Sequence, residues 1–142
     1  MHRILLPFDG SAHALHAAQH LAGLAQQCPD LQVHVLNVQD NPVYAVGIVD
    51  ERGMHQIEEG LRAEGRKIVL KAAEVLAAAS IPHQLHVQIG PVAQTIIDQT
   101  KALGCDSIVM GCRGLGALSG LALGSIATRV VHLSSVPVTL VK

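Results

Sequence analysis

Short apolar runs alternate with longer segments of helical periodicity along the whole of this sequence. The apolar runs cover residues 2–8, 31–38, 82–89, 106–110 and 138–141, and helix-like segments separate them. When strands alternate with helices, each helix returns the chain across one face of a parallel sheet. The alternation therefore predicts an α/β protein with an open, doubly wound, five-stranded parallel sheet and helices on both faces.

The helical segments have recognisable starts and stops. Ser11 is a favourable N-cap for a helix over 12–27, and Gly104 ends a helix that begins near Pro91. Apolar spacing predicts further helices over 54–79 and 125–133. Residues 40–53 contain Pro42, Gly47 and Gly53 and show no periodicity, so we expect a loop there.

Length and charge limit the class of protein. A chain of 142 residues fits a single domain, here 1–142. The net charge is −1 and aromatic residues make up 1% of the chain, so neither phosphate attraction nor base stacking favours a nucleic-acid partner. The uncharged stretch between Arg113 and Arg129 is short and rich in Gly and Ser, so we expect no membrane partner.

The three cysteines, Cys28, Cys105 and Cys112, form no closely spaced pair. An odd number of separated cysteines indicates free thiols and a reducing compartment. The N-terminus enters an apolar run directly and lacks the features of a signal peptide. These observations predict a cytoplasmic protein.

A glycine-rich stretch from Met110 to Ile126 follows the fourth apolar run and ends where a helix begins. Glycine lets backbone N–H groups approach a ligand, and a helix N-terminus adds unpaired donors and a partial positive charge. This order of strand, loop and helix suits a triphosphate. The Walker A and dinucleotide motifs both fit poorly, because no lysine precedes Ser125 and Ser119 stands where the last glycine of G-x-G-x-x-G belongs.

The stretch does match G-x-x-G, nine residues, then G-S, in Gly111, Gly114, Gly124 and Ser125. This spacing resembles the nucleotide-binding motif of the universal stress protein family. The opening residues 4–11, the run 108–114 and the closing run 136–141 also resemble that family. A flexible glycine-rich surface loop without a ligand is the alternative.

The resemblance implies a strand order of 3-2-1-4-5 and ATP as the ligand, often with Mg²⁺ or Mn²⁺ on the phosphates. Family precedent surrounds the adenosine with Pro7, Asp9 and Val38. It surrounds ribose and phosphates with the loop that follows Met110 and with the start of the last helix. The loop and helix residues that this implies are Met110, Gly111, Arg113, Gly114, Leu115, Gly124, Ser125 and Ile126. Phe8 and Cys112 depart mildly from the family pattern.

With this strand order, strands one and four meet where the sheet reverses, which is where ligands bind in such folds. Asp9 ends the first strand and Gly111 follows the fourth, so both reach one crevice. Asp9 is an acceptor for a nucleoside or a plain turn residue. Arg113 is a phosphate ligand or a solvated loop charge. Cys112 is a quiet small residue or a redox-sensitive thiol.

Histidines 13, 16 and 20 share one face of the first helix. His16 and His20 have metal-chelating spacing, but two ligands without a third rarely form a physiological site. We therefore expect a solvated polar face and no metal site.

Three functions follow from the sequence. The first is an ATP-binding regulatory module of the stress response, with an unknown protein partner. The second is a slow ATPase or self-phosphorylating enzyme with Ser125 or Ser119 as acceptor. The third is a nucleotide-free dimerisation scaffold. By resemblance, a homodimer would form through the apolar closing strand Val138 to Val141. No base or metal carboxylate is evident for fast hydrolysis.

Overall fold

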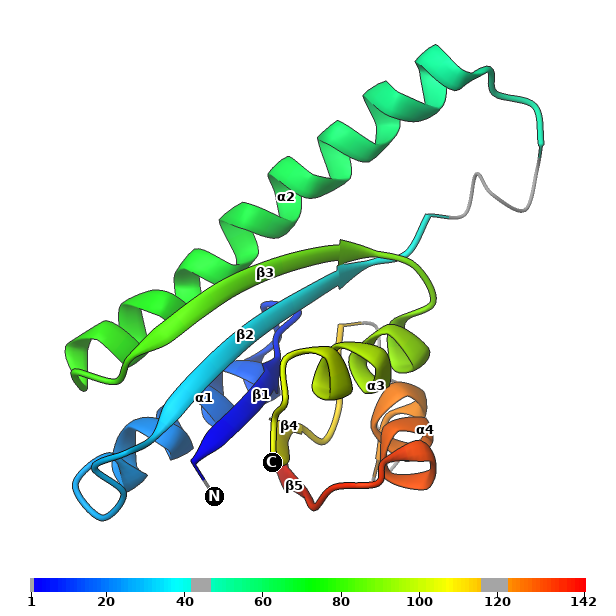
Figure 1. The fold of residues 1–142 in the computed structure, drawn as a ribbon. Coiled ribbons are helices and arrows are strands. Elements are labelled where there is room, and N and C mark those ends of the chain that lie inside the picture. The colour runs from blue at the N-terminus through cyan, green and yellow to red at the C-terminus, as the bar shows by residue number, and fades with distance from the viewer. Residues whose placement is uncertain (1, 42–46, 116–122) are drawn as a thin grey trace.

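The chain forms one five-stranded sheet in which every strand is parallel to its neighbours. The computed structural model describes residues 2–41, 47–115 and 123–142. The strands are β1 (Arg3–Pro7), β2 (Gln32–Gln39), β3 (His83–Ile89), β4 (Ser107–Gly111) and β5 (Val138–Val141). Their order across the sheet is β3-β2-β1-β4-β5, as predicted (Figure 1).

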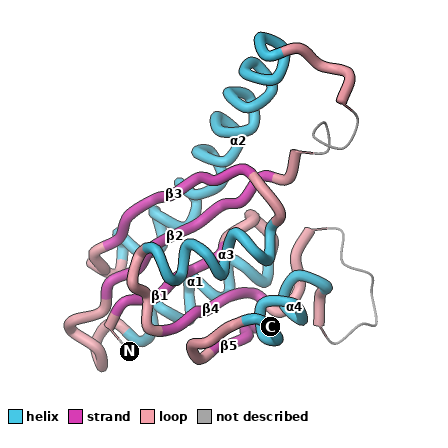
Figure 2. Tube along the Cα trace, turned by 45° about the vertical axis from the view of Figure 1, so that its right-hand side comes forward, coloured by secondary structure: helices cyan, strands magenta, loops and turns pink. Residues whose placement is uncertain are grey.

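Helices cover both faces of the sheet, as the alternating pattern predicts (Figure 2). On one face lie α1 (Ala12–Leu24) and α2 (Glu51–Ala78), and on the other α3 (Val92–Ala102) and α4 (Ser125–Leu133). Each face has its own apolar core. Ile4, Leu6 and Val35 belong to the first core, whereas Leu5, Leu36 and Ile108 belong to the second. Alternate residues of one strand thus serve opposite cores.

The main departure from the predicted elements is the start of α2. We predicted a loop over 40–53 and a helix from Met54, but α2 begins at Glu51. The Asp50 side chain accepts a hydrogen bond from the Gly53 backbone N–H at 2.8 Å, so Asp50 is an N-cap. This local cap outweighs the cost of Gly53 in the first turn. Residues 42–46 of the predicted loop lie outside the described part of the chain.

The other element boundaries agree with the sequence to within a few residues. The largest of these differences is at α1, which ends at Leu24 instead of the predicted residue 27. The last helix and the last strand have the predicted bounds. Periodicity therefore identifies every element of this sheet, and capping geometry decides where the helices begin and end.

All three cysteines are free thiols, as expected from their spacing. Burial raises the pKa of the Cys105 thiol to about 11. Among the described residues, no helix is both long enough and apolar enough to cross a membrane.

Candidate functional site

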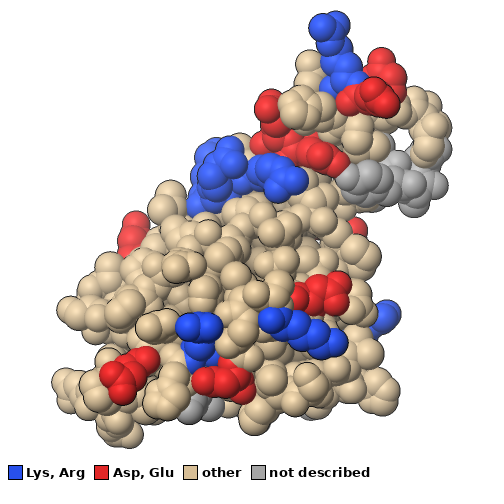
Figure 3. All heavy atoms as spheres, viewed as in Figure 1, with Lys and Arg blue, Asp and Glu red and all other residues tan. Residues whose placement is uncertain are grey.

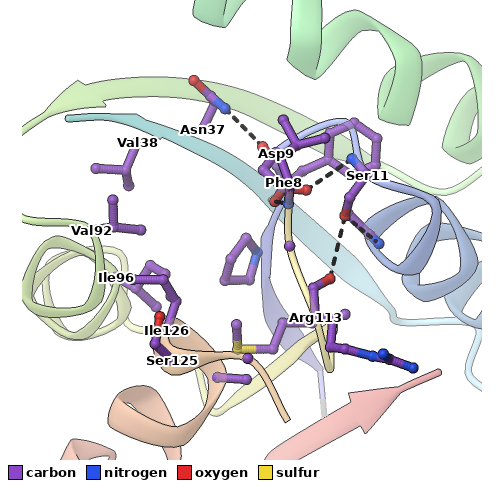
Figure 4. Close-up of a pocket in the computed structure, with 18 of the residues that line it drawn as sticks. Phe8, Asp9, Ser11, Asn37, Val38, Val92, Ile96, Arg113, Ser125 and Ile126 are labelled. Atoms are coloured by element: carbon purple, nitrogen blue, oxygen red, sulfur yellow. Dashed lines mark hydrogen bonds between the residues drawn. The ribbon is translucent and has the colours of Figure 1, made fainter. Parts of the chain in front are cut away.

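The carboxyl ends of β1 and β4 open into a cavity of about 360 Å³, within the range of small-molecule sites. β1 and β4 are neighbours in the sheet, and here the strand order reverses. Every residue predicted for the site lines this cavity: Pro7, Asp9, Val38, Met110, Gly111, Arg113, Gly114, Leu115, Gly124, Ser125 and Ile126. Figure 4 shows side chains from both halves of the chain around it.

One half of the cavity has apolar walls. Val38 lies next to the end of β2, Val92 and Ile96 come from α3, and Ala127 comes from the first turn of α4. Val38, Val92 and Ile96 lie along one side of the close-up, with Ile126 near Ile96 (Figure 4). Ile96 and Ala127 also belong to the core on this face of the sheet. The apolar half is therefore held by the packing that stabilises the fold.

The other half of the cavity is formed by the glycine loop and the start of α4. The loop leaves β4 at Cys112 and returns at Gly124, whose N–H donates to the Cys112 carbonyl at 2.7 Å. Gly124 is the N-cap of α4 and provides no side-chain cap, and the first helical bond runs from the Thr128 N–H to the Gly124 carbonyl. The amides of residues 125–127 therefore have no partner within the helix, which suits an anion.

The three glycines of the motif have different close neighbours, so a side chain is excluded at each position for a different reason. A Cβ on Gly111 would lie 2.7 Å from the Ala14 backbone nitrogen, so helix packing alone requires glycine there. A Cβ on Gly114 would lie 2.6 Å from the Asp9 carboxylate, which is a side chain that can move. A Cβ on Gly124 would lie 3.3 Å from the Arg113 Cα. Gly114 and Gly124 thus shape the loop, whereas Gly111 also permits the fold.

Asp9 joins the end of β1 to the glycine loop. Its Oδ1 accepts from the Ser11 N–H at 2.9 Å, and its Oδ2 accepts from the Leu115 N–H at 3.0 Å. Gly10 follows with φ of 83°, a left-handed conformation that glycine adopts without strain. The Asp9 carboxylate is therefore both a turn acceptor, one of the two predicted alternatives, and the contact that holds Leu115 beside the cavity.

Arg113 is one of the residues that line the cavity. Its guanidinium points away from Val92 and Ile96 in the close-up, and its carbonyl accepts a long bond of 3.5 Å from the Ser11 hydroxyl (Figure 4). The buried Nε of Arg113 has no hydrogen-bond partner among the described residues. In this conformation the guanidinium is not directed at the apolar half of the cavity.

Asn37 is a site residue that the sequence analysis missed. Its side chain is buried, donates to the Phe8 carbonyl at 2.9 Å and accepts from Gln39 at 2.7 Å. Because Phe8 precedes Asp9, Asn37 fixes the backbone that carries the carboxylate into the cavity. A polar residue between Leu36 and Val38, in the most apolar part of β2, was the available signal.

Two of the three histidines of α1 contact the end of β4 or the C-terminus. The His13 Nδ1 lies 3.1 Å from the Cys112 sulfur, and the His16 Nδ1 lies 2.9 Å from the Lys142 carbonyl oxygen. Within the described ranges, no group of three His, Cys, Asp or Glu side chains could hold a metal ion. Cys112 itself is buried against α1, which is consistent with a packing role.

Comparison with known proteins identifies the family. The profile of the Universal stress protein family matches residues 1–142. Universal stress protein YxiE of Bacillus subtilis is 32% identical over 147 aligned positions, covering 99% of this chain and 98% of YxiE. The solved structure of the protein MJ0577 superposes with a TM-score of 0.84 at 25% identity, covering 99% of this chain and 95% of MJ0577.

Several similar structures contain adenine nucleotides. The Arabidopsis thaliana universal stress family protein At3g01520, solved with AMP bound, has a TM-score of 0.72 at 14% identity, with 100% of this chain and 92% of that protein covered. A universal stress protein solved with cAMP and the Archaeoglobus fulgidus protein solved with dAMP have TM-scores of 0.68 and 0.65. The family profile and the sequence relatives agree over nearly the whole chain, and the chain therefore belongs to the universal stress protein family.

Proposed function

We propose that this protein binds an adenine nucleotide, with ATP as the preferred ligand, and acts as a regulatory module of the stress response. The observation that carries the proposal is the junction of an apolar cavity with a glycine loop and an unpaired helix N-terminus. The two parts match the two ends of a nucleotide. The AMP, dAMP and cAMP complexes of family members support the same ligand class.

In the proposed complex the adenosine occupies the apolar half, between Val38, Val92 and Ile96. Asp9 accepts a hydrogen bond from the ribose or the base. The phosphates extend along Gly114 and Gly124 to the free amides at the start of α4, where the helix dipole favours negative charge. Backbone donors suit this task because they are fixed before the ligand arrives.

Mg²⁺ or Mn²⁺ would reach this site with the phosphates. Asp9 is the only acidic residue among the described residues that line the cavity, and two backbone N–H groups already occupy its oxygens. The phosphate oxygens and water would therefore supply most of the metal ligands.

Calorimetric titration tests the proposal. ATP, ADP, AMP and adenosine are added in turn to protein freed of nucleotide by unfolding and refolding. We expect one site per chain and affinity that rises with the number of phosphates. Gly124→Val should weaken ATP binding, because the proposed phosphates lie along Gly124. Gly23→Val is the control, because a Cβ at this helical position meets nothing within 4 Å. The absence of ATP binding by the wild type would refute the proposed function.

We expect slow or no hydrolysis. The described lining residues include no histidine and no second carboxylate to activate water. Ser125 lines the cavity and remains the candidate acceptor in the alternative of self-phosphorylation. Ser119, the other predicted acceptor, lies outside the described residues. Metal-dependent phosphate release that is lost in Ser125→Ala would favour the enzyme.

We also propose a homodimer through β5, as expected from the family resemblance. β5 is the outer strand of the sheet and all four of its residues are partly exposed. The Pro137 and Val141 carbonyls face β4, so alternation directs the backbone of Leu140 outward. Leu140→Pro should therefore remove a dimer contact, with Leu140→Ala as the control for the side chain. In light scattering, Leu140→Pro should have a lower mass than Leu140→Ala. The same mass for both variants would argue against this interface.

Finally, we propose a cytoplasmic location and an unidentified protein partner that reads the bound state. Three free thiols favour a reducing compartment. Without nucleotide, the same domain would serve only as a dimeric scaffold, which is the remaining alternative.

A further inference from the structure

The N-terminal half of α2 projects beyond the sheet. Both ribbon views show this part of the helix leaving the domain past the ends of β2 and β3 (Figures 1 and 2). The first buried residue of α2 is Gly65, where a Cβ would lie 2.5 Å from Val87 of β3. We call residues 51–64 the α2 arm. At 1.5 Å per residue the arm is about 21 Å long.

The arm continues the apolar face by which the rest of α2 packs on the sheet. At roughly 100° per residue, Met54, Ile57 and Leu61 lie in the same stripe as the packed residues Ile68 and Ala72. No residue of the arm is fully buried by the described part of the chain. Just before the arm, Ile48 is 81% exposed and Val49 is 37% exposed. An apolar stripe that extends beyond the sheet it packs on indicates a surface for a partner.

Charges at the two ends of the arm identify the partner. Glu51 near the tip, Glu58 near the middle and Arg62 near the base lie along the same edge of the stripe, and Glu51 and Arg62 are exposed. Figure 3 shows acidic side chains on the protruding part of α2 and basic side chains nearer the body of the domain, with one basic side chain at the tip. By the same spacing, Arg52 lies on the opposite face from Leu61.

We propose that the arm pairs antiparallel with the α2 arm of a second copy of this chain. In antiparallel helices the same flank of each helix meets its counterpart, so Glu51 of one copy would lie beside Arg62 of the other, twice per dimer. Ile57 lies near the midpoint of these two residues and would lie at the two-fold axis. The stripe of Met54, Ile57 and Leu61 would then be covered by its own copy. This interface lies at the edge of the sheet opposite β5 and does not depend on nucleotide binding.

Disulfide trapping tests the geometry. In a Cys28→Ser background, Ile57→Cys should form a disulfide-linked dimer under mild oxidation. Gln56→Cys is the matched control, because this neighbouring exposed position is turned about 100° from Ile57 and lies outside the stripe. Trapping at Ile57 should exceed trapping at Gln56 at least fivefold. Equal trapping at the two positions would overturn the proposal.

Charge reversal tests the identity and direction of the partner. Glu51→Arg and Arg62→Glu, each added to the Ile57→Cys chain, place like charges at positions 51 and 62, and such arms should self-pair at least threefold less. Mixed together, the two variants should form the linked pair at the original yield, because both contacts between positions 51 and 62 are again between opposite charges. Mixing that fails to restore trapping, or trapping that ignores both reversals, would contradict the antiparallel pair. Circular dichroism checks that the arm stays helical in each variant.

Discussion

The two halves of the cavity are specified in different ways. The apolar half consists of side chains such as Ile96 and Ala127 that the core would require in any case. The glycine half is the loop after β4 and the start of α4, and its glycines do not pack in a core. Gly114 and Gly124 matter because they lack a side chain and so let the loop backbone come close to its neighbours. The apolar half therefore exists because the core needs those side chains, whereas the glycine half is the part of the cavity that is suited to an anion.

Gly111 belongs to the glycine motif, but it packs against the backbone of α1 as part of the fold. Gly111→Ala places a Cβ against the α1 backbone, which cannot move as a side chain would. We expect a loss of about 3 kcal/mol in the free energy of unfolding, typical of overpacking in a rigid site. Urea denaturation measures it. Gly114→Ala is the control and should cost about 1 kcal/mol or less, since the Asp9 side chain can turn aside. Equal losses would remove the distinction.

Val92→Phe tests the apolar half alone. Val92 is half-buried at the first turn of α3, so a larger ring should enter the cavity with little strain in the core. We expect adenosine and ATP to lose affinity by about 30-fold, or about 2 kcal/mol, from lost apolar contact. Inorganic triphosphate, which needs only the glycine half, should bind as before. Competition with a fluorescent nucleotide measures all three ligands, and a parallel loss of triphosphate binding would argue against separate halves.

Asp9→Asn tests the connection between the halves. An asparagine can still accept from Ser11, but its amide cannot accept from the Leu115 N–H if that end faces the loop. We expect ATP affinity to fall about tenfold, or about 1.4 kcal/mol. Calorimetry provides the measurement, and thermal unfolding of the same sample shows whether the fold is retained. An unchanged affinity would make Asp9 a turn residue only.

The smallest expected effect is on the pH dependence of stability, and it comes from a histidine pair on β2 and β3 that does not line the cavity. His34 and His86 are hydrogen-bonded at 2.9 Å. Burial lowers the pKa of both, and the neighbouring His86 and Arg3 lower the pKa of His34 further. The unfolded chain therefore binds more protons, so the free energy of unfolding should fall as pH falls below about 6.5.

His86→Gln should flatten this pH dependence between pH 7 and 5, whereas His20→Gln, at an exposed position on α1, should leave it unchanged. Urea denaturation at each pH gives the comparison. Nucleotide affinity should be the same in both variants, because neither histidine lines the cavity. A pH profile that His86→Gln does not alter would show that other groups control it.

Most of the fold could be predicted from the sequence because each element has its own periodicity. The strand order came from family resemblance, and the start of α2 depends on a single side-chain cap at Asp50 that periodicity does not record. For the site, the glycine spacing predicted the loop, and the strand order brought Asp9 to it. Asn37 and Ala127 escaped prediction because their roles depend on other elements: Asn37 donates to the Phe8 carbonyl, and Ala127 packs in the core beneath α3 and α4.

The central claim is that one cavity binds a nucleoside and its phosphates in two separable halves. The most direct test compares adenosine with ATP in the wild type and in Gly114→Val/Gly124→Val. We predict that the double variant keeps its adenosine affinity within about threefold but loses the advantage that ATP has over adenosine. If ATP keeps its advantage in the double variant, or if adenosine is lost together with ATP while the fold survives, the account is contradicted.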